Sequence, residues 1–171
     1  MNEIIKLAPI KSLEEFVEIR DSIDGNLVIT SGGFDPIHPG HIDCIIHSKR
    51  YGDVLGVVVN GDNFLRNKKG AAFMNLATRC KVVAAIRGVD FVIPYEVEND
   101  QTVCGALSAI QPDFFTKGGD YVSADTIPEW DICIENDIDV ITGVGNSKSH
   151  SSSDMLENWY DRRLRIFSEQ A

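Results

Sequence analysis

One stretch in the first third of the chain constrains the fold more than any other. An apolar run at residues 27–31 leads into Gly32 and Gly33, and Pro39 then precedes an apolar-rich segment with helical periodicity. Proline suits the first turn of a helix, because it fixes φ and lacks only an N–H that would have no partner there. The next apolar run, at residues 54–59, is continuous, which fits a strand buried on both faces. This order predicts a βαβ unit, whose crossover is right-handed in nearly all proteins.

The alternation of strand and helix patterns continues through the rest of the chain. Strands are expected at residues 27–31, 54–59, 91–93, 113–116 and 140–142. Helices are expected at residues 39–51, 75–87, 102–110 and 128–136, and from residue 153 onward. A further helix precedes the first strand, since Ser12 with Glu15 three positions later forms a capping box. We therefore predict an α/β fold, a Rossmann-like doubly wound parallel sheet of about five strands in a single domain.

Length and composition restrict the class of protein. At 171 residues, with 43% hydrophobic and 25% charged residues, the chain matches an ordinary globular domain. It has no apolar run near the ~20 residues that span a bilayer, and its first residues lack the long apolar core of a secretory signal. The 4 cysteines are widely spaced, which favours reduced thiols over disulfides or zinc. We expect a cytoplasmic protein that does not bind membranes.

The net charge of −10 directs the search for a ligand site. Surfaces that bind nucleic acid carry a basic stripe, so this chain is expected not to bind nucleic acid. An acidic protein that binds an anion must gather its cations locally. One group of cations, Arg66, Lys68 and Lys69, lies in a predicted loop after the second strand. Open α/β sheets place their ligands at such carboxyl ends of strands, which makes this loop part of the expected site.

Residues 32–41 have the chemistry of a phosphate-binding loop. The glycines let the backbone approach a ligand, and the free N–H groups and dipole at the following helix start attract anions. His38 and His41 add donors that can carry charge near neutral pH. Two histidines at this spacing are also found as buried core residues or metal ligands, so the pair alone decides little. Together with the glycines and the helix start, the pair suits a polyphosphate.

These ten residues resemble the GxFDxxHxGH signature of the cytidylyltransferase-like nucleotidyltransferases, which make CDP-alcohols, ADP-sugars, FAD and dephospho-coenzyme A. The signature residues present are Gly32, Phe34, Asp35, His38, Gly40 and His41. Over roughly residues 10–158 the chain is most similar to the adenylyltransferase part of the bifunctional heptose-phosphate kinase/adenylyltransferases, which make ADP-heptose. The resemblance implies an N-terminal lead-in helix within residues 1–25 and a nucleotidyltransferase domain at residues 26–171.

The loop chemistry and the resemblance together assign roles to particular residues. Catalytic roles are predicted for His38, His41, Lys68 and Lys69. Nucleotide binding is predicted for Gly32, Gly33, Phe34, Asp35, Pro39, Gly40, Lys117, Gly118, Gly119, Asp120, Ser151, Ser152 and Ser153. Substrate binding is predicted for Asn60, Asp62 and Arg79. No resident metal is expected, and Mg²⁺ is expected to arrive with the nucleoside triphosphate. Asp35 is expected to bond backbone N–H groups of the turn in preference to a metal.

Three hypotheses about the activity remain open. The chain offers no obvious nucleophile–base pair, which disfavours a covalent mechanism, whereas nucleotidyl transfer needs mainly positioning and cations. The first hypothesis is an adenylyltransferase that joins ATP to a sugar phosphate and releases pyrophosphate. The second is a cytidylyltransferase that uses CTP and glycerol, ethanolamine or another alcohol phosphate. The family's late serine motif resembles Ser151-Ser152-Ser153 of this chain, and the family's cytidylyltransferases carry an arginine ahead of it, where this chain has Asn146 and Lys148. The third is a nucleotide-binding module without catalysis.

The last predicted helix carries apolar residues that fit either the core or a partner protein. These residues are Met155, Leu156, Trp159, Leu164 and Phe167. Arg162, Arg163 and Arg165 suit the negative end of the helix dipole. Because relatives of the family are often dimers, the resemblance adds a homodimer to the expected small-molecule partners.

Overall fold

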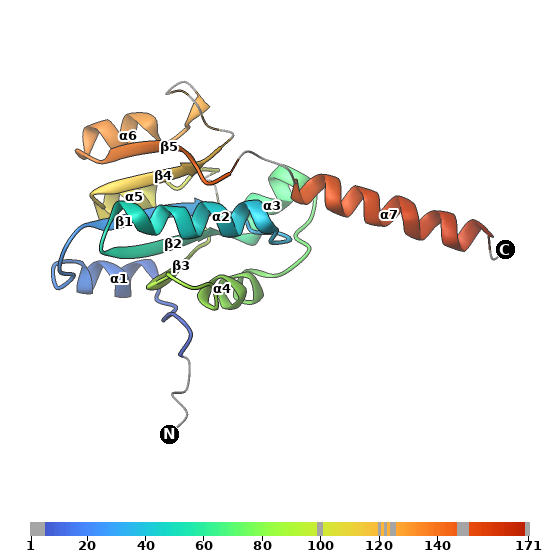
Figure 1. Ribbon diagram of the computed structural model, residues 1–171, viewed down its shortest axis with the longest axis horizontal. Helices are drawn as coiled ribbons and strands as arrows, with labels where there is room; N and C mark the ends of the chain where they lie inside the picture. The colour runs from blue at the N-terminus through green and yellow to red at the C-terminus, as the bar shows by residue number, and fades with distance from the viewer. Residues whose placement is uncertain are drawn as a thin grey trace.

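The structure, a computed structural model, describes residues 6–98, 101–119, 121, 123, 126–146 and 151–169, and its centre is one parallel sheet (Figure 1). The strands are β1 (Leu27–Gly32), β2 (Val54–Asn60), β3 (Phe91–Tyr95), β4 (Phe114–Gly118) and β5 (Asp139–Val144). Their order is β3-β2-β1-β4-β5, and every pairing is parallel. The predicted Rossmann-like doubly wound sheet is confirmed.

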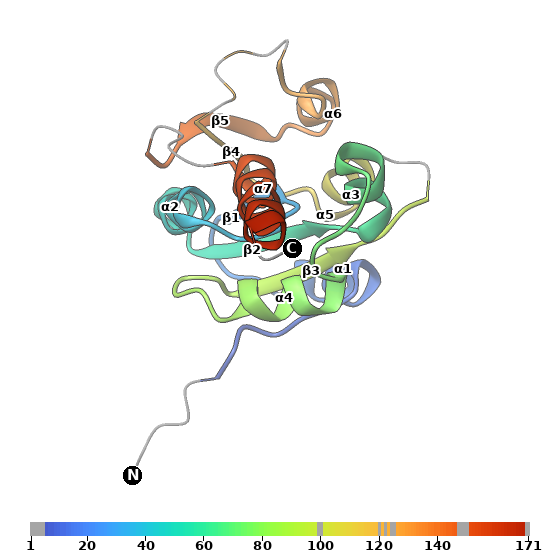
Figure 2. The ribbon, with the colours of Figure 1, turned by 90° about the vertical axis from the view of Figure 1, so that its right-hand side faces the viewer.

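Helices cover both faces of the sheet. The helices of the described residues are α1 (Leu13–Arg20), α2 (Pro39–Ser48), α3 (Asp62–Lys69), α4 (Leu76–Ala84), α5 (Cys104–Ile110), α6 (Trp130–Glu135) and α7 (Ser152–Glu169), with a short 3-10 helix, η1 (Lys49–Tyr51). α1, α5 and α6 lie on one face, and α2 and α4 lie on the other (Figure 2). Each face has its own apolar core, with Phe16 and Leu107 in the first and Ile45 and Val83 in the second. Burial on both faces explains why β2 is a continuous apolar run.

The N-terminal helix is part of this core. The predicted capping box is present, since the N–H of Ser12 donates to the Glu15 carboxylate and the N–H of Glu15 donates to the Ser12 hydroxyl. Phe16 is fully buried and meets the ring of Phe91 edge-on, with centroids 5.2 Å apart. The lead-in helix within residues 1–25 therefore packs directly on the sheet.

The segment after β2 corrects the sequence prediction. Residues 62–69 form α3, whereas a loop was expected. The carboxylate of Glu96 accepts the N–H groups of Asp62 at 2.5 Å and Asn63 at 2.9 Å, which satisfies two donors at the helix start. Gly70 ends the helix in the left-handed conformation, with φ of 84°. α3 has few apolar residues and its cap comes from the end of β3, so its own sequence carries a weak helix signal.

Two further predictions concern thiols and membranes. The cysteines are free, and burial raises the pKa of Cys80 to about 11 and that of Cys133 to about 12. Both thiols therefore stay protonated near neutral pH. In the part of the chain that the structure describes, no helix combines the length and apolar character needed to cross a lipid bilayer.

Candidate functional site

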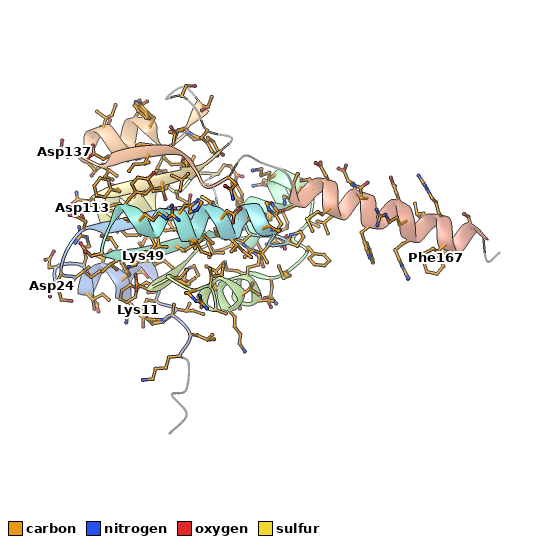
Figure 3. All side chains as sticks on the ribbon, in the orientation of Figure 1. Lys11, Asp24, Lys49, Asp113, Asp137 and Phe167 are labelled. Carbon is orange, nitrogen blue, oxygen red and sulfur yellow. The ribbon has the colours of Figure 1, made fainter. Side chains whose placement is uncertain are left out.

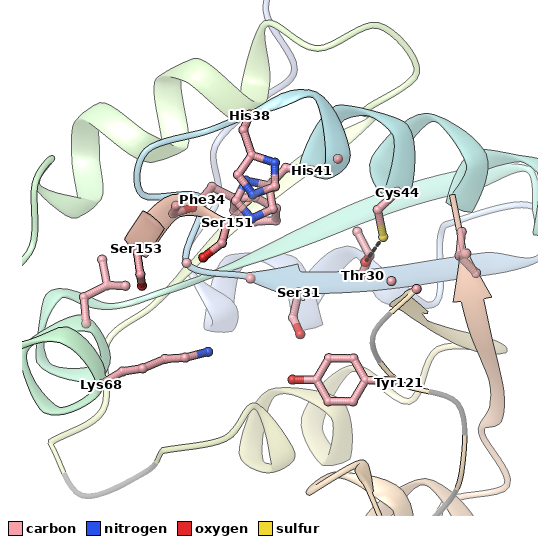
Figure 4. A pocket seen from close by; sticks show the side chains of 18 of the residues that line it. Thr30, Ser31, Phe34, His38, His41, Cys44, Lys68, Tyr121, Ser151 and Ser153 are labelled. Carbon is pink, nitrogen blue, oxygen red and sulfur yellow. Dashed lines mark hydrogen bonds between the residues drawn. The ribbon is translucent and has the colours of Figure 1, made fainter. Parts of the chain in front are cut away.

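A pocket of about 440 Å³ opens at the carboxyl end of β1 (Figure 4). The strand order reverses here, because β1 pairs with β2 on one side and with β4 on the other. Open α/β sheets bind ligands in the crevice at such a reversal. Most of the residues predicted for the site line this pocket, namely Gly32, Gly33, Phe34, His38, Gly40, His41, Lys68, Lys69, Gly118, Gly119, Ser151, Ser152 and Ser153.

The two histidines form one stacked pair. The ring centroids of His38 and His41 are 3.7 Å apart, and their planes differ by 21°. Gly40 leaves room for this pair, since a β-carbon there would lie 3.2 Å from Cε1 of His38. Phe34 meets His41 edge-on with centroids 5.2 Å apart, and a β-carbon on Gly32 would lie 2.9 Å from the Phe34 ring. Phe34 adopts φ of 51°, which is uncommon for a bulky residue, so the loop holds a strained conformation that places the aromatic rings.

Two helix starts face the pocket. α2 begins at Pro39 as predicted, although Pro39 itself does not line the pocket. The hydroxyl of Ser151 accepts the N–H of Asp154 at 3.4 Å, and the hydroxyl of Ser152 donates to the carbonyl of Pro36 at 2.9 Å. The second bond ties the start of α7 to the loop between β1 and α2. Ser151 consequently lies beside the two imidazoles (Figure 4). Positive dipole ends and free N–H groups from both helices attract an anion here.

The two lysines of α3 have different surroundings. Lys68 extends across the pocket in the direction of Ser31 and Tyr121 (Figure 4). Lys69 also lines the pocket, but its ammonium donates to the backbone carbonyl of Asp35 at 2.8 Å. Burial lowers the pKa of Lys69. Lys68 is therefore the lysine with its ammonium directed into the pocket, whereas Lys69 holds the glycine loop through the carbonyl of Asp35.

Asp35 is internal and connects two loops. It is 1% exposed, and its carboxylate oxygens accept the N–H groups of Phe73 at 2.7 Å and Met74 at 2.8 Å. It thus bonds backbone N–H groups as expected, but these belong to the loop before α4 and not to its own turn. The described residues that line the pocket include no carboxylate. Among the described residues, no cluster of three or more histidine, cysteine, aspartate or glutamate side chains fits a metal ion.

The three residues predicted to bind substrate form an internal network instead. Arg79 is fully buried, and its guanidinium donates to the carbonyls of Gly33 at 2.8 Å, Asn60 at 2.6 Å and Met74 at 3.0 Å. It also forms an ion pair with Asp62 at 2.6 Å. None of Asn60, Asp62 and Arg79 is among the described residues lining the pocket. Arg79 instead holds together the loops that follow β1 and β2.

Lys117 also lies outside the pocket lining. Its ammonium forms a buried ion pair with Glu129 at 3.0 Å and lies 4.9 Å from the ring centroids of both Phe115 and Tyr121. Tyr121 does line the pocket, so Lys117 supports a pocket residue from behind. Asp120 and Lys148 lie outside the described residues, and their roles stay predictions.

Several residues that line the pocket had not been assigned to it. They are Thr30, Ser31, Cys44, Phe64, Leu65, Tyr121, Val144 and Asn146. Most occupy strand or helix positions whose small or apolar character also fits core packing, so their patterns do not distinguish a pocket wall from a core. Tyr121 and Asn146 are different, because each follows the carboxyl end of a parallel strand, where ligands bind. The side chain of Asn146 is held by a 2.8 Å bond to Asp43.

Comparison with curated proteins finds partial matches. The bifunctional protein HldE of Histophilus somni is 35% identical over 111 residues, which cover 64% of this chain and 23% of that protein. HldE of Desulfatibacillum aliphaticivorans is 34% identical over 118 residues, which cover 68% of this chain and 24% of that protein. The chain thus spans about a quarter of the length of these curated relatives.

Two solved structures have similar folds. A lipopolysaccharide core biosynthesis protein from Thermoplasma volcanium superposes with a TM-score of 0.61 and 25% identity, over 72% of this chain and 99% of that one. A pantoate-beta-alanine ligase from Francisella tularensis superposes with a TM-score of 0.64 over 86% of this chain and 72% of that one. Its sequence identity is 16%, so it shows the fold alone. The profile of the cytidylyltransferase-like family matches residues 29–158, which is more than half of the sequence. The chain therefore belongs to the cytidylyltransferase-like family of nucleotidyltransferases.

Proposed function

We propose that the pocket binds the phosphates of a nucleoside triphosphate and that the chain transfers the nucleotidyl group to a phosphorylated small molecule. One observation carries the proposal: His38, His41, Lys68 and the starts of α2 and α7 meet at one pocket of a chain whose net charge is −10. Concentrating donors in this way favours an anionic ligand at that place. Helix starts and ammonium groups bind phosphate oxygens through charge-assisted hydrogen bonds.

In the proposed reaction, an oxygen of the acceptor phosphate attacks the α-phosphorus of the triphosphate. A new P–O bond forms, the bond from the α-phosphorus to the bridging oxygen breaks, and its electron pair leaves with pyrophosphate. His38 and His41, with the start of α2, stabilise charge on the α-phosphoryl oxygens and on the leaving group. Lys68 contacts the β- and γ-phosphates. Such transfer depends on in-line positioning and preorganised charge, and it needs no protein nucleophile.

The rest of the pocket fits the remaining parts of the nucleotide. Ser151 lies beside the imidazoles and Ser153 lies farther from them in the same pocket, and both add donors for the phosphates (Figure 4). Thr30 and Cys44 lie farther from this donor group, on the side where we place the nucleoside (Figure 4). We propose that Mg²⁺ enters as part of the substrate, bound to triphosphate oxygens, since the described pocket lining supplies no carboxylate to hold it alone.

For the substrates, we favour ATP and a sugar phosphate. The similarity to HldE proteins supports this choice, because it agrees with the resemblance to heptose-phosphate adenylyltransferases. The Thermoplasma structure, a lipopolysaccharide core biosynthesis protein, also points to sugar chemistry. A cytidylyltransferase acting on an alcohol phosphate is the alternative, and the description of the family as cytidylyltransferase-like supports its choice of nucleotide. Asn146, in place of an arginine before the serine motif, argues against it.

A triphosphate panel tests both the activity and its specificity. The chain is incubated with Mg²⁺, each nucleoside triphosphate in turn and a pool of sugar phosphates and alcohol phosphates, and pyrophosphate is measured. We expect release with ATP that depends on a sugar phosphate, and a nucleoside-diphosphate sugar in the mass spectrum. Release with CTP and not with ATP would reject the adenylyltransferase. If a folded preparation releases no pyrophosphate, whichever triphosphate of the panel is supplied, the proposal of catalysis is rejected.

Lys68 and Lys69 should differ when each is replaced by alanine. We expect Lys68→Ala to lower kcat/KM for the triphosphate by roughly 10–100-fold and to leave the urea midpoint unchanged, because its ammonium points into the pocket (Figure 4). We expect Lys69→Ala to lower the urea midpoint, since it removes the bond to the Asp35 carbonyl. Initial rates and urea titrations of both variants check this. Equal effects of the two changes on kcat/KM would contradict the assignment.

A further inference from the structure

A buried ion pair lies directly behind the wall of the pocket. Lys117 and Glu129 are 7% and 4% exposed, and the Lys117 ammonium is 3.0 Å from the Glu129 carboxylate. Removing both charges from water costs free energy that their attraction often fails to return, so stability alone is a weak reason for such a pair. The ammonium also contacts the ring of Tyr121, a pocket residue to which the proposed transfer gives no role. This contact points to a role in the site.

Strand β4 directs the Lys117 side chain to the face of the sheet opposite α2. Side chains two positions apart in a strand share a face, and Phe115 belongs to the core that α1, α5 and α6 cover. On that face Glu129 occupies the N-cap position of α6. Its second carboxylate oxygen accepts the N–H of Val103, the residue before α5, at 3.4 Å. One carboxylate thus joins β4, α5 and α6, which fixes the position of the ammonium.

The ammonium in turn restrains an aromatic ring of the pocket wall. Nζ of Lys117 lies 4.9 Å from the ring centroid of Tyr121 and 4.9 Å from that of Phe115. The N–H of Tyr121 donates to the carbonyl of Gly118 at 3.1 Å, and this turn at the end of β4 brings the Tyr121 ring to the ammonium. A cation attracts an aromatic face more strongly where water is excluded. The position of the Tyr121 ring is therefore set by its own backbone and by Lys117.

The hydroxyl of this ring is directed at the centre of the pocket. It points toward Ser31 and Lys68, from the side of the pocket away from the imidazoles (Figure 4). Lys68 is the lysine proposed to contact the β- and γ-phosphates. A phenol hydroxyl can donate to an anionic phosphate oxygen through a charge-assisted hydrogen bond. The ring and its hydroxyl thus suit the same phosphates that Lys68 would bind.

We propose that the Tyr121 hydroxyl binds the triphosphate and that Lys117 and Glu129 are positioning residues that hold the ring for this contact. The proposal rests on the proposed function, because it adds a donor to the same phosphate site. Lys117 acts through Tyr121, since its ammonium is paired with Glu129 and lies outside the described pocket lining. This role replaces the direct nucleotide contact that the family resemblance predicts for Lys117.

Nucleotide affinity tests the hydroxyl contact. Isothermal titration with MgATP in the absence of an acceptor measures Kd without turnover, and MgCTP is used instead if the triphosphate panel selects CTP. Tyr121→Phe keeps the ring and removes one hydrogen bond to a charged group, so it should raise Kd roughly tenfold. An unchanged Kd for this variant overturns the contact.

Lys49→Met is the matched control for changes of a paired lysine. Lys49 forms an ion pair with Asp90 at 2.6 Å and is not part of the described pocket lining. It follows the last residue of α2, at the end of that helix farther from α7 (Figure 3). Kd should stay within about twofold of the wild-type value, even where the melting temperature falls.

Removing both charges of the buried pair tests the positioning. Lys117→Met/Glu129→Gln leaves no single charge in the interior, and glutamine can still accept the Val103 N–H. We expect Kd to rise roughly threefold to tenfold, because the ring loses its cation. Combined with Tyr121→Phe, the double change should raise Kd no further than Tyr121→Phe does alone, since the supported contact is already absent. Effects that multiply, or a double variant that binds like wild type, overturn the positioning role. Glu129→Gln alone replaces the double change if that variant does not fold, and the same comparison applies.

A fluorine spectrum without nucleotide separates this proposal from the proposed function. The chain has 4 tyrosines, and in protein labelled with 3-fluorotyrosine the resonance lost in Tyr121→Phe belongs to Tyr121. Lys117→Met/Glu129→Gln should shift that resonance, because a charge 4.9 Å from the ring is removed, whereas Lys49→Met should not. A resonance that stays in place overturns the positioning role. A wild type that binds neither nucleotide overturns the proposed function and the hydroxyl contact together, and the fluorine shift still decides whether Lys117 sets the ring.

Discussion

Replacing His41 with alanine is expected to lower the rate of pyrophosphate release by roughly 10²–10³-fold, the usual cost of losing one preorganised donor at a developing charge. The imidazole lines the pocket and stacks on His38 at 3.7 Å, at the start of α2, where the proposed α-phosphate binds. Its removal withdraws a donor that water in the vacated space cannot replace at the same position. Steady-state rates of pyrophosphate release with saturating triphosphate measure the effect.

His47→Ala is the matched control for this change. His47 lies in the last turn of α2, outside the pocket lining, so the same substitution on the same helix should leave the rate within about twofold. Both variants should melt at nearly the temperature of the wild type if the His41 effect is chemical. A His41→Ala enzyme that releases pyrophosphate at the wild-type rate would remove the histidine pair from the mechanism.

Replacing Arg79 with methionine is expected to lower the free energy of unfolding by about 3–5 kcal/mol, the largest stability effect predicted for this chain. The buried guanidinium is the donor for three backbone carbonyls and for the carboxylate of Asp62. Without it these acceptors are left in the interior with no donor, since methionine fills similar space but cannot hydrogen-bond. Urea titration followed by circular dichroism gives the change directly.

Two further variants make this test specific. Arg66→Met removes an exposed arginine of α3 that donates only to Asn63 among the bonds identified, and it should cost less than about 1 kcal/mol. Arg79→Lys should not restore stability, because an ammonium cannot reproduce the planar fork that reaches several acceptors at once. If Arg79→Met proved as stable as Arg66→Met, the network around Arg79 would not hold these loops together.

The sheet was predictable because its signals are local. The continuous apolar run of β2, the glycine loop after β1 and the proline at the start of α2 each depend on residues that are neighbours in sequence. The missed helix α3 shows the limit of such signals. Its start is capped by Glu96, more than 30 residues later, so no sequence pattern within residues 62–69 predicts the helix.

For the site, too, some features follow from neighbouring residues and others follow only from the tertiary structure. The sequence by itself predicted that residues 32–41 bind phosphate, because glycines, a helix start and two histidines act through their own backbone and side chains. Only the tertiary structure decided which of the chain's cations face the pocket. Lys68 does, whereas Lys117 is paired with Glu129 and Arg79 is enclosed by backbone carbonyls. A buried cation must find acceptors wherever the fold supplies them, and those acceptors come from segments far apart in the chain.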